Sequence, residues 1–477
     1  MSKQVKINLF QYISVFLILV LFLLNIKNSF FWDTVQLGSK HANYYLTNNF
    51  SSLLLPNSID SGHIPAFGIY IGFIWKIFGR NLIVSHIAML PFILGIIWQL
   101  SNVIRFYFKK KHSGFVAFLI LLDPTLLSQF TLVSPDIPLI FFFLLGWHSI
   151  IRNSKYILLI SIFFLFLTSM RGMMVAFCLL IIDVFYNLSF KDSFKNVLNS
   201  LLKRSLIYLP SLLLFIAFSV YHYLEKGWIG YHDDSPWAGC FERVDNLNGL
   251  IYNIGILGWR IIDFGRIGIW IVFLILFFKY RKKILKDKQT LSLLLIFICF
   301  LLILPSNMIW AKNLLGHRYL IPIYLTFSFL VAKILFSSYT SSRFKIILSL
   351  IWLLSVISGN FWVYPDKISQ GWDSTLAHLP YFKLRKQAIY YLDKQKIDIN
   401  EVHSFFPNTS IIDNIDLNED YRNFSNYIKE AEYVLYSNVY NINDETYDTL
   451  KDKYDLIKEF KNLTVFIRIY KKKVFIR

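Results

Sequence analysis

Long apolar stretches, separated by short polar segments, recur along most of this 477-residue chain. A helix needs about 20 apolar residues to cross the hydrocarbon core of a bilayer. Stretches near that length follow one another, so the pattern predicts a polytopic membrane protein built from helices. We expect about eleven membrane spans, at 9–28, 83–106, 114–131, 137–151, 156–170, 172–187, 206–224, 260–278, 290–305, 319–336 and 344–363.

The composition agrees with this pattern, since 55% of the residues are hydrophobic and the mean hydropathy is +0.49. The formal net charge of +19 does not indicate nucleic acid, because the basic residues stand in short runs between apolar stretches. When the spans alternate, these runs fall on one side, which is cytoplasmic by the positive-inside rule. We therefore expect a multi-pass protein of the bacterial inner (plasma) membrane with its N-terminus in the cytoplasm.

The chain changes character after residue 363, where charged and amide residues become frequent and the apolar runs become short. Residues 382–396 are expected to form an amphipathic helix, and 432–440 and 463–470 alternate as strands do. The predicted domains are thus a transmembrane unit, 1–363, and a small soluble α/β unit outside the membrane, 364–477. Residues 66–80 are apolar but interrupted by charge, which favours a helix lying at the membrane interface.

Ionisable residues gather at the span ends that face the outer side. A charge at this depth is costly unless it has a partner or a function, so the group predicts a membrane-embedded enzyme site. Histidine adds a side chain whose charge depends on pH. The candidates are Asp33, Asp60, His63, Asp136, Arg171, Lys312, His317 and Arg318.

Several motifs occur along the chain in a fixed order. An aspartate follows the first span, Gly-His-Ile-Pro at 62–65 leads into the interfacial helix, Pro-Asp-Ile-Pro-Leu covers 135–139, and His-Arg-Tyr-Leu-Ile-Pro covers 317–322. In this order, over residues 1 to 340, the chain resembles the GT-C superfamily of membrane glycosyltransferases. The resemblance is to the branch that holds protein O-mannosyltransferases and lipid A aminoarabinose transferases.

The resemblance implies transfer of a sugar from a polyprenyl-phosphate donor to an acceptor on the outer face. Asp33 would be the catalytic carboxylate, with Asp136 as a second acidic residue of the site. Asp136 also fits the pattern of a helix N-cap, and Asp60 also fits a solvated loop residue. His63 stands where the aminoarabinose branch has a lysine, which is a departure at the expected phosphate contact.

Cations would hold the departing phosphate, and we expect this role for one or more of Arg171, Lys312, His317 and Arg318. For Lys312 the alternative is snorkelling to the interface. The indole of Trp372, in Gly-Trp-Asp, is a candidate sugar contact, although a folding role is an equal alternative. The sugar and the acceptor, whether glycan, lipid or protein, are not indicated by the sequence.

No cofactor is expected, although a divalent metal is the alternative for the 225–258 loop. That loop contains His232, Asp233, Asp234, Glu242 and Asp245, but their spacing matches no ligand pattern. A lipid or polysaccharide transporter or flippase is the alternative function. Transport would favour polar or broken helices near the bilayer midplane, whereas the charges here gather at one face.

Overall fold

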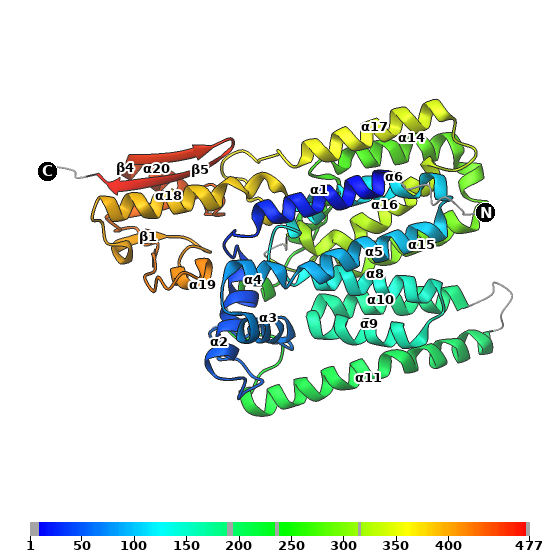
Figure 1. Ribbon diagram of the computed structural model, residues 1–477, viewed down its shortest axis with the longest axis horizontal. Coiled ribbons are helices and arrows are strands. Elements are labelled where there is room, and N and C mark those ends of the chain that lie inside the picture. Colours follow the sequence, from blue (N-terminus) through cyan, green and yellow to red (C-terminus); the bar gives the residue numbers. More distant parts are fainter. Residues whose placement is uncertain (1–8, 188–193, 234–237, 313–315, 474–477) are drawn as a thin grey trace.

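The computed structural model describes residues 9–187, 194–233, 238–312 and 316–473. Long helices run side by side through most of the molecule, and a five-stranded sheet lies at one end (Figure 1). The short helices α2 (His41–Thr47) and α3 (Ala66–Phe78) lie at the end of the helical bundle that is nearer the sheet. The protein is therefore mostly helical, as the sequence predicts.

The helices of the bundle and its loops share high apolar content and short connections. They are α1 (Leu9–Asn25), η1 (Val35–Lys40), α2 (His41–Thr47), α3 (Ala66–Phe78), α4 (Leu82–Ile87), α5 (Leu90–Tyr107), α6 (Lys110–Leu121), α7 (Pro124–Gln129), α8 (Asp136–Ile151), α9 (Lys155–Thr168), α10 (Met170–Asn187), α11 (Phe194–Lys226), α12 (Ala238–Phe241), α13 (Leu247–Ile262), α14 (Arg266–Ile284), α15 (Lys288–Ile303), η2 (His317–Leu320), α16 (Ile321–Leu335) and α17 (Ser342–Gly359).

Within the described residues, 5 helices are long and apolar enough to cross a membrane, or up to 6 if the bent pair of α13 and α14 counts as one span. Shorter apolar helices include α1, α8, α9 and α15. The five long helices, the bent pair and these four shorter helices lie at ten of the eleven expected spans, and the exception is the span at 114–131. The number of crossings and the orientation of the termini stay predictions.

The expected span at 114–131 is not one helix. The chain breaks at Asp123, between α6 and α7, because the Asp123 carboxylate accepts hydrogen bonds from the backbone N–H groups of Thr125 and Leu126 at 3.0 and 3.1 Å. Asp-Pro at this position is an N-cap followed by proline in the first turn, which starts a new helix. The hydropathy pattern does not indicate this break, because the residues on both sides of it are apolar.

The sheet is formed by residues that follow the last long helix. Its elements are η3 (Trp372–Ser374), η4 (Leu376–His378), α18 (Pro380–Lys394), η5 (Ile399–Glu401), β1 (Val402–Ser404), α19 (Ile412–Asp416), β2 (Ser425–Asn426), β3 (Tyr433–Ser437), α20 (Asp444–Lys453), β4 (Tyr454–Asn462) and β5 (Val465–Lys472). The strand order is β2-β1-β3-β5-β4, with β1 parallel to both its neighbours and the other pairs antiparallel. The helix and both strands expected from the sequence lie at α18, β3 and β5.

This sheet-bearing segment is attached to the part of the chain between α1 and α4. Phe31 is fully buried in its hydrophobic core, and its ring stacks on His378 at 5.1 Å between centroids. Arg80, just beyond α3, donates from both terminal nitrogens to the Asp413 carboxylate at 3.0 and 2.7 Å. These contacts fix the segment next to Asp33, whereas the division into domains at residue 363 stays a prediction.

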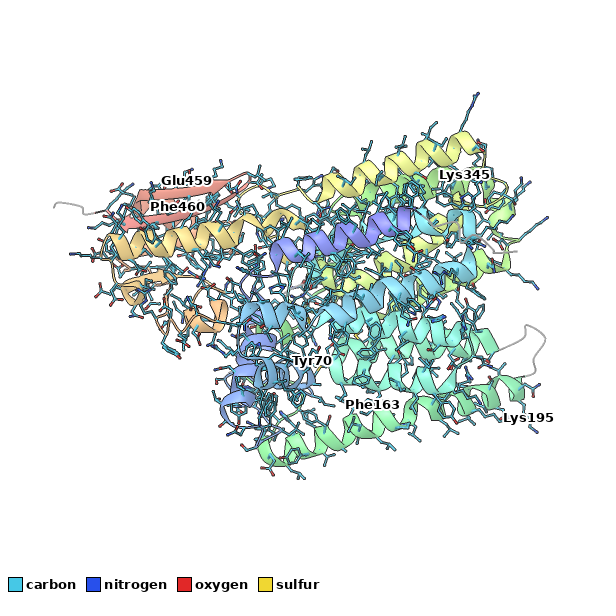
Figure 2. All side chains as sticks on the ribbon, in the orientation of Figure 1. Tyr70, Phe163, Lys195, Lys345, Glu459 and Phe460 are labelled. Carbon is cyan, nitrogen blue, oxygen red and sulfur yellow. The ribbon has the colours of Figure 1, made fainter. Side chains whose placement is uncertain are left out.

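Charged side chains mark the two ends of the molecule (Figure 2). Lys195 and Lys345 lie at the end away from the sheet, while Glu459 lies on the sheet itself. The apolar bundle lies between these ends. This geometry fits the expected topology, in which the basic loops and the sheet lie on opposite sides of the membrane.

Candidate active site

Arg318 is the centre of a cluster of carboxylates. Its Nη2 donates to Asp33 in a short hydrogen bond, and its Nη1 donates to Asp373 Oδ2 at 2.6 Å. Its Nε lies 3.4 Å from Asp136 Oδ2. Its Nη2 also donates to the Tyr319 hydroxyl at 3.0 Å. Because the Arg318 side chain is only 5% exposed, these four contacts determine how its guanidinium is oriented. A planar guanidinium with a carboxylate on each edge is a rigid arrangement.

The side chains of the cluster come from the starts of helices. Arg318 lies on η2, which leads into α16, while Asp136 is the first residue of α8 and Arg171 the second residue of α10. The carboxylate of Asp136 is favoured there by the partial positive charge of a helix N-terminus. Asp136 does not cap α8, since Pro135 is the N-cap and no side chain caps it, so the N-cap interpretation was wrong.

Arg171 is the second cation of the cluster. Its Nη1 donates to Asp136 Oδ1 at 2.5 Å, and its guanidinium lies 3.7 Å from the ring centroid of Tyr319. Within the described part of the chain, Asp136 is its one hydrogen-bond partner. With 18% of its side chain exposed, Arg171 keeps donors for a ligand.

Asp33 is the most exposed carboxylate of the cluster, at 25% of its side chain. The residue before it, Trp32, has a φ of 52°, which is a strained conformation for a bulky residue. The π-helical turn η1 follows directly. Both features are found preferentially at functional sites. The Tyr319 hydroxyl, 3.4 Å from Asp33 Oδ2, is a further polar neighbour.

Asp373 is the site residue that sequence reasoning missed. Burial raises the pKa of its carboxyl, and the nearby charges of Asp33 and Asp136 raise it further, whereas Arg318 lowers it. The Gly-Trp-Asp segment was singled out for its indole, but Trp372 is 3% exposed, so no ring face is open to a sugar. Trp372 has the folding role, and the aspartate beside it reaches the cluster.

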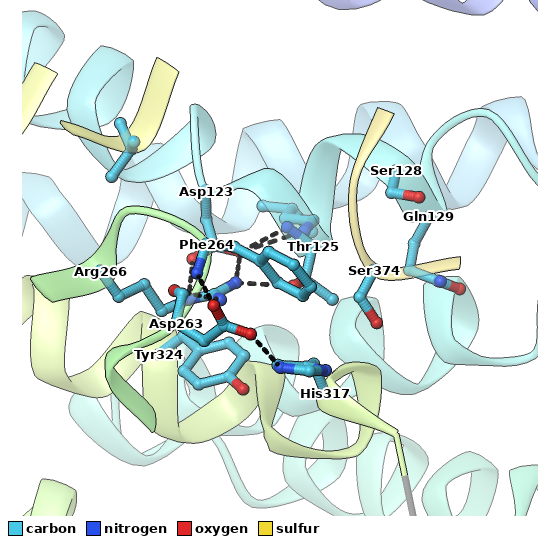
Figure 3. Close-up of polar contacts among 12 residues, drawn as sticks. Asp123, Thr125, Ser128, Gln129, Asp263, Phe264, Arg266, His317, Tyr324 and Ser374 are labelled. Carbon is cyan, nitrogen blue, oxygen red and sulfur yellow. Dashed lines mark hydrogen bonds and ion pairs between the residues drawn. The ribbon is translucent and has the colours of Figure 1, made fainter. Parts of the chain in front are cut away.

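A second buried network supports the first (Figure 3). Arg266 Nε and Nη2 donate to the Asp123 carboxylate at 2.8 and 2.7 Å, and Nη2 also donates to Thr125 Oγ1 at 2.6 Å. His317 Nε2 donates to Asp263 Oδ2 at 2.9 Å. The Tyr364 hydroxyl donates to the same oxygen. His317 is thus engaged next to the Arg318 cluster rather than within it.

Asp60 and His63 lie in the loop before α3, close to Arg171. Asp60 is 3% exposed, and its Oδ2 lies 3.1 Å from His222 Nε2, so the solvated interpretation was wrong. Burial lowers the pKa of His63, and the positive charge of Arg171 lowers it further against the opposing effect of Asp60. His63 is therefore a neutral hydrogen-bonding group, which is how it differs from a lysine.

The remaining candidates lie apart from the Arg318 cluster. Lys312 is 69% exposed and pairs with Glu242 at 2.8 Å, so among the described residues it has no contact with the cluster. No group of three His, Cys, Asp or Glu residues able to hold a metal is found in the described residues. Asp234 lies outside them.

Two buried neutral histidines predict acid sensitivity. Burial lowers the pKa of His41 to about 3 and that of His378 to about 4, against an ordinary value near 6.5. The histidines of the unfolded chain then bind protons more readily than those of the folded chain. The stability that the two neutral side chains contribute is therefore fully present above pH 6.5 and is lost as the pH falls below that value. Each histidine is expected to cost about 2 kcal/mol at pH 5.

Thermal unfolding of detergent-purified protein at pH 7 and pH 5 measures this loss. His378→Asn keeps a donor for the Thr375 carbonyl, which His378 Nδ1 contacts at 2.6 Å. This variant is expected to lose about 2 kcal/mol less stability than the wild type between pH 7 and pH 5. Equal acid sensitivity of this variant and the wild type would contradict the assignment.

Comparison with known proteins gives structural neighbours only. No family model and no curated protein matches the chain. Two solved structures are similar, "ArnT from Cupriavidus metallidurans bound to Undecaprenyl phosphate" and the same protein in the apo state. Each has 12% sequence identity and a TM-score of 0.49, with 96% of this chain and 97% of the other covered.

Proposed function

We propose that this protein is a membrane glycosyltransferase. It moves a sugar from a polyprenyl-phosphate donor to an acceptor hydroxyl at the outer end of the helical bundle. The observation that carries the proposal is the cluster in which Arg318 joins Asp33, Asp136 and Asp373, with Arg171 beside it. Such a group supplies both a carboxylate for the acceptor and a cation for the leaving phosphate.

The different exposure of the two arginines suggests a different role for each. Arg318 donates from Nη1 to Asp373 and from Nη2 to Asp33 and to the Tyr319 hydroxyl, and it is almost fully buried, which leaves little for a ligand. Arg171 is more exposed and has donors to spare. We therefore assign the donor phosphate to Arg171, with His63 as a neutral hydrogen-bonding neighbour.

An apolar cavity of about 710 Å³ begins at the residue that follows His63 in the chain. Its lining comes from α3, α9 and α11 and includes Tyr70 and Phe163 (Figure 2). Ile64, the neighbour of His63, also lines it. Of the candidate spans, α11 has the smallest buried share, 22%, so this side borders the lipid. An isoprenoid chain fits such a surface, because its burial removes apolar area from water.

The reaction is a single displacement at the anomeric carbon. Asp33 accepts the proton of the acceptor hydroxyl while the acceptor oxygen forms a bond to that carbon. The bond from the anomeric carbon to the phosphate oxygen breaks, and its electron pair stays on the polyprenyl phosphate. Arg171 stabilises the charge that develops there. Asp136 keeps Arg171 and Arg318 in place through its two oxygens.

Binding of the lipid phosphate, which is the donor without its sugar, tests the phosphate assignment. Radiolabelled undecaprenyl phosphate is titrated onto the purified protein in nanodiscs. Arg171→Gln is expected to weaken binding by about 10-fold or more, the value of a charge-assisted hydrogen bond. The control is Lys312→Gln, which removes an exposed cation and should leave affinity unchanged. Wild-type affinity in Arg171→Gln would contradict the assignment.

A further inference from the structure

Asp373 comes from a different part of the chain than the other members of the cluster. It lies on η3, beyond the last long helix and ahead of the sheet. Its carboxylate nevertheless meets Arg318 Nη1 at 2.6 Å, on the guanidinium edge next to the one that holds Asp33. The side chain is 10% exposed, so it is enclosed at the contact.

The backbone of this segment is held independently of the carboxylate. Ser128 Oγ and Gln129 Nε2, both on α7, donate to the Asp373 carbonyl oxygen at 2.7 and 2.8 Å. Figure 3 shows both side chains near Ser374. Gly371 lies so close to His317 that a Cβ there would be 3.0 Å from Nδ1. The position of Asp373 is therefore set by main-chain contacts. Its carboxylate accepts from Ser374 Oγ at 3.3 Å with Oδ1 and from Arg318 with Oδ2.

We propose that Asp373 is a positioning residue of the transferase site: it fixes Nη1 of Arg318 so that Nη2 is directed at Asp33. This inference rests on the proposed function. A guanidinium has five donors in one plane, and carboxylates on its separate edges prevent it from rotating. Without Asp373, Nη1 is free to compete for Asp33 and Asp136, and the orientation of Asp33 towards the acceptor is lost. Small misplacements of this kind have large effects on rate.

Steady-state transfer by the full-length protein tests the inference. Asp373→Asn keeps the backbone contacts with α7 and the shape of the side chain while removing its charge. We expect kcat to fall about 10- to 100-fold and the donor KM to stay within about threefold, because Arg171 and the apolar cavity are untouched. Wild-type kcat in this variant, or a loss confined to donor KM, would overturn the inference.

Asp416→Asn is the matched structural control. Asp416 is also buried in the sheet-bearing segment and pairs with Arg385 and Ser29, but it has no contact with Arg318 among the described residues. Its loss should lower the unfolding temperature with much less effect on kcat. An equal fall in kcat for Asp416→Asn would reduce Asp373 to a structural role and overturn the inference.

If Asp373→Asn does not fold, the isosteric pair Asp373→Glu and Asp373→Gln gives the same comparison. The Glu variant is expected to turn over about fivefold faster than the Gln variant, and equal rates would overturn the inference. Absence of transfer by the wild type contradicts the proposed function itself. Active wild type with unchanged Asp373 variants contradicts the positioning role alone.

Discussion

Replacing Asp33 with asparagine is expected to reduce sugar transfer by about 10²- to 10⁴-fold, the contribution of a positioned general base. The substitution removes the proton acceptor but keeps the shape of the side chain and one acceptor oxygen for Arg318 Nη2. Asp33 is the carboxylate of the cluster with the largest exposed fraction, 25%, so an acceptor hydroxyl reaches it more readily than Asp136. Donor affinity should change little, because the phosphate is assigned to Arg171.

Initial rates of transfer with saturating donor measure this effect, and the unfolding temperature of the variant shows that it is folded. The matched control is Asp448→Asn, an aspartate with a 52% exposed side chain that pairs with Lys367 on the sheet-bearing segment. That variant should transfer sugar like the wild type. An Asp33→Asn variant that retains more than a tenth of the rate would contradict the role of Asp33 as the base.

The second large effect is expected on stability. Arg266→Met should destabilise the protein by about 3–5 kcal/mol, the cost of leaving a buried charge without its partner. Arg266 is 2% exposed, and its guanidinium holds the Asp123 carboxylate with two nitrogens. The loss should also disturb α7, whose Ser128 and Gln129 hold the backbone of Asp373.

Thermal unfolding in detergent measures this change. Asp123→Asn combined with Arg266→Met removes both charges of this buried pair and keeps an N-cap for α7, so it should recover much of the lost stability. The exposed ion pair between Lys312 and Glu242 is the control. Lys312→Met should change the stability of the protein by less than about 1 kcal/mol. An Arg266→Met variant as stable as Lys312→Met would show that the buried pair is not what supports α7.

The helices were predictable because hydropathy is a local property of the sequence. A run such as 137–151 is apolar enough to specify a helix by itself, and it corresponds to α8. The helix expected at 66–80 was predictable for the same reason, since Gly79 and Arg80 end its apolar run, and it corresponds to α3. Its position at the membrane interface stays a prediction. The break at Asp123 was missed because two short apolar helices on either side of a cap give the same hydropathy as one long helix.

The members of the cluster were largely predictable as single residues, but their partners were not. Asp33 and Arg318 are 285 positions apart, and periodicity carries no information on such a contact. Lys312 was grouped with Arg318 because it is near in sequence, yet it lies in an exposed loop. Asp373 was missed because its neighbours are polar and irregular, so nothing local separates it from the other acidic residues after 363.

The measurement that tests the central claim most directly is transfer of radiolabel from a panel of polyprenyl-phosphate sugars to mixed acceptors. Purified wild-type protein and Asp33→Asn are compared in matched membranes. The proposed function predicts that label leaves one donor and appears on an acceptor with the wild type, and stays on the lipid with Asp33→Asn. Label that remains on every donor, while labelled lipid crosses the bilayer, would contradict the transferase and support a transporter.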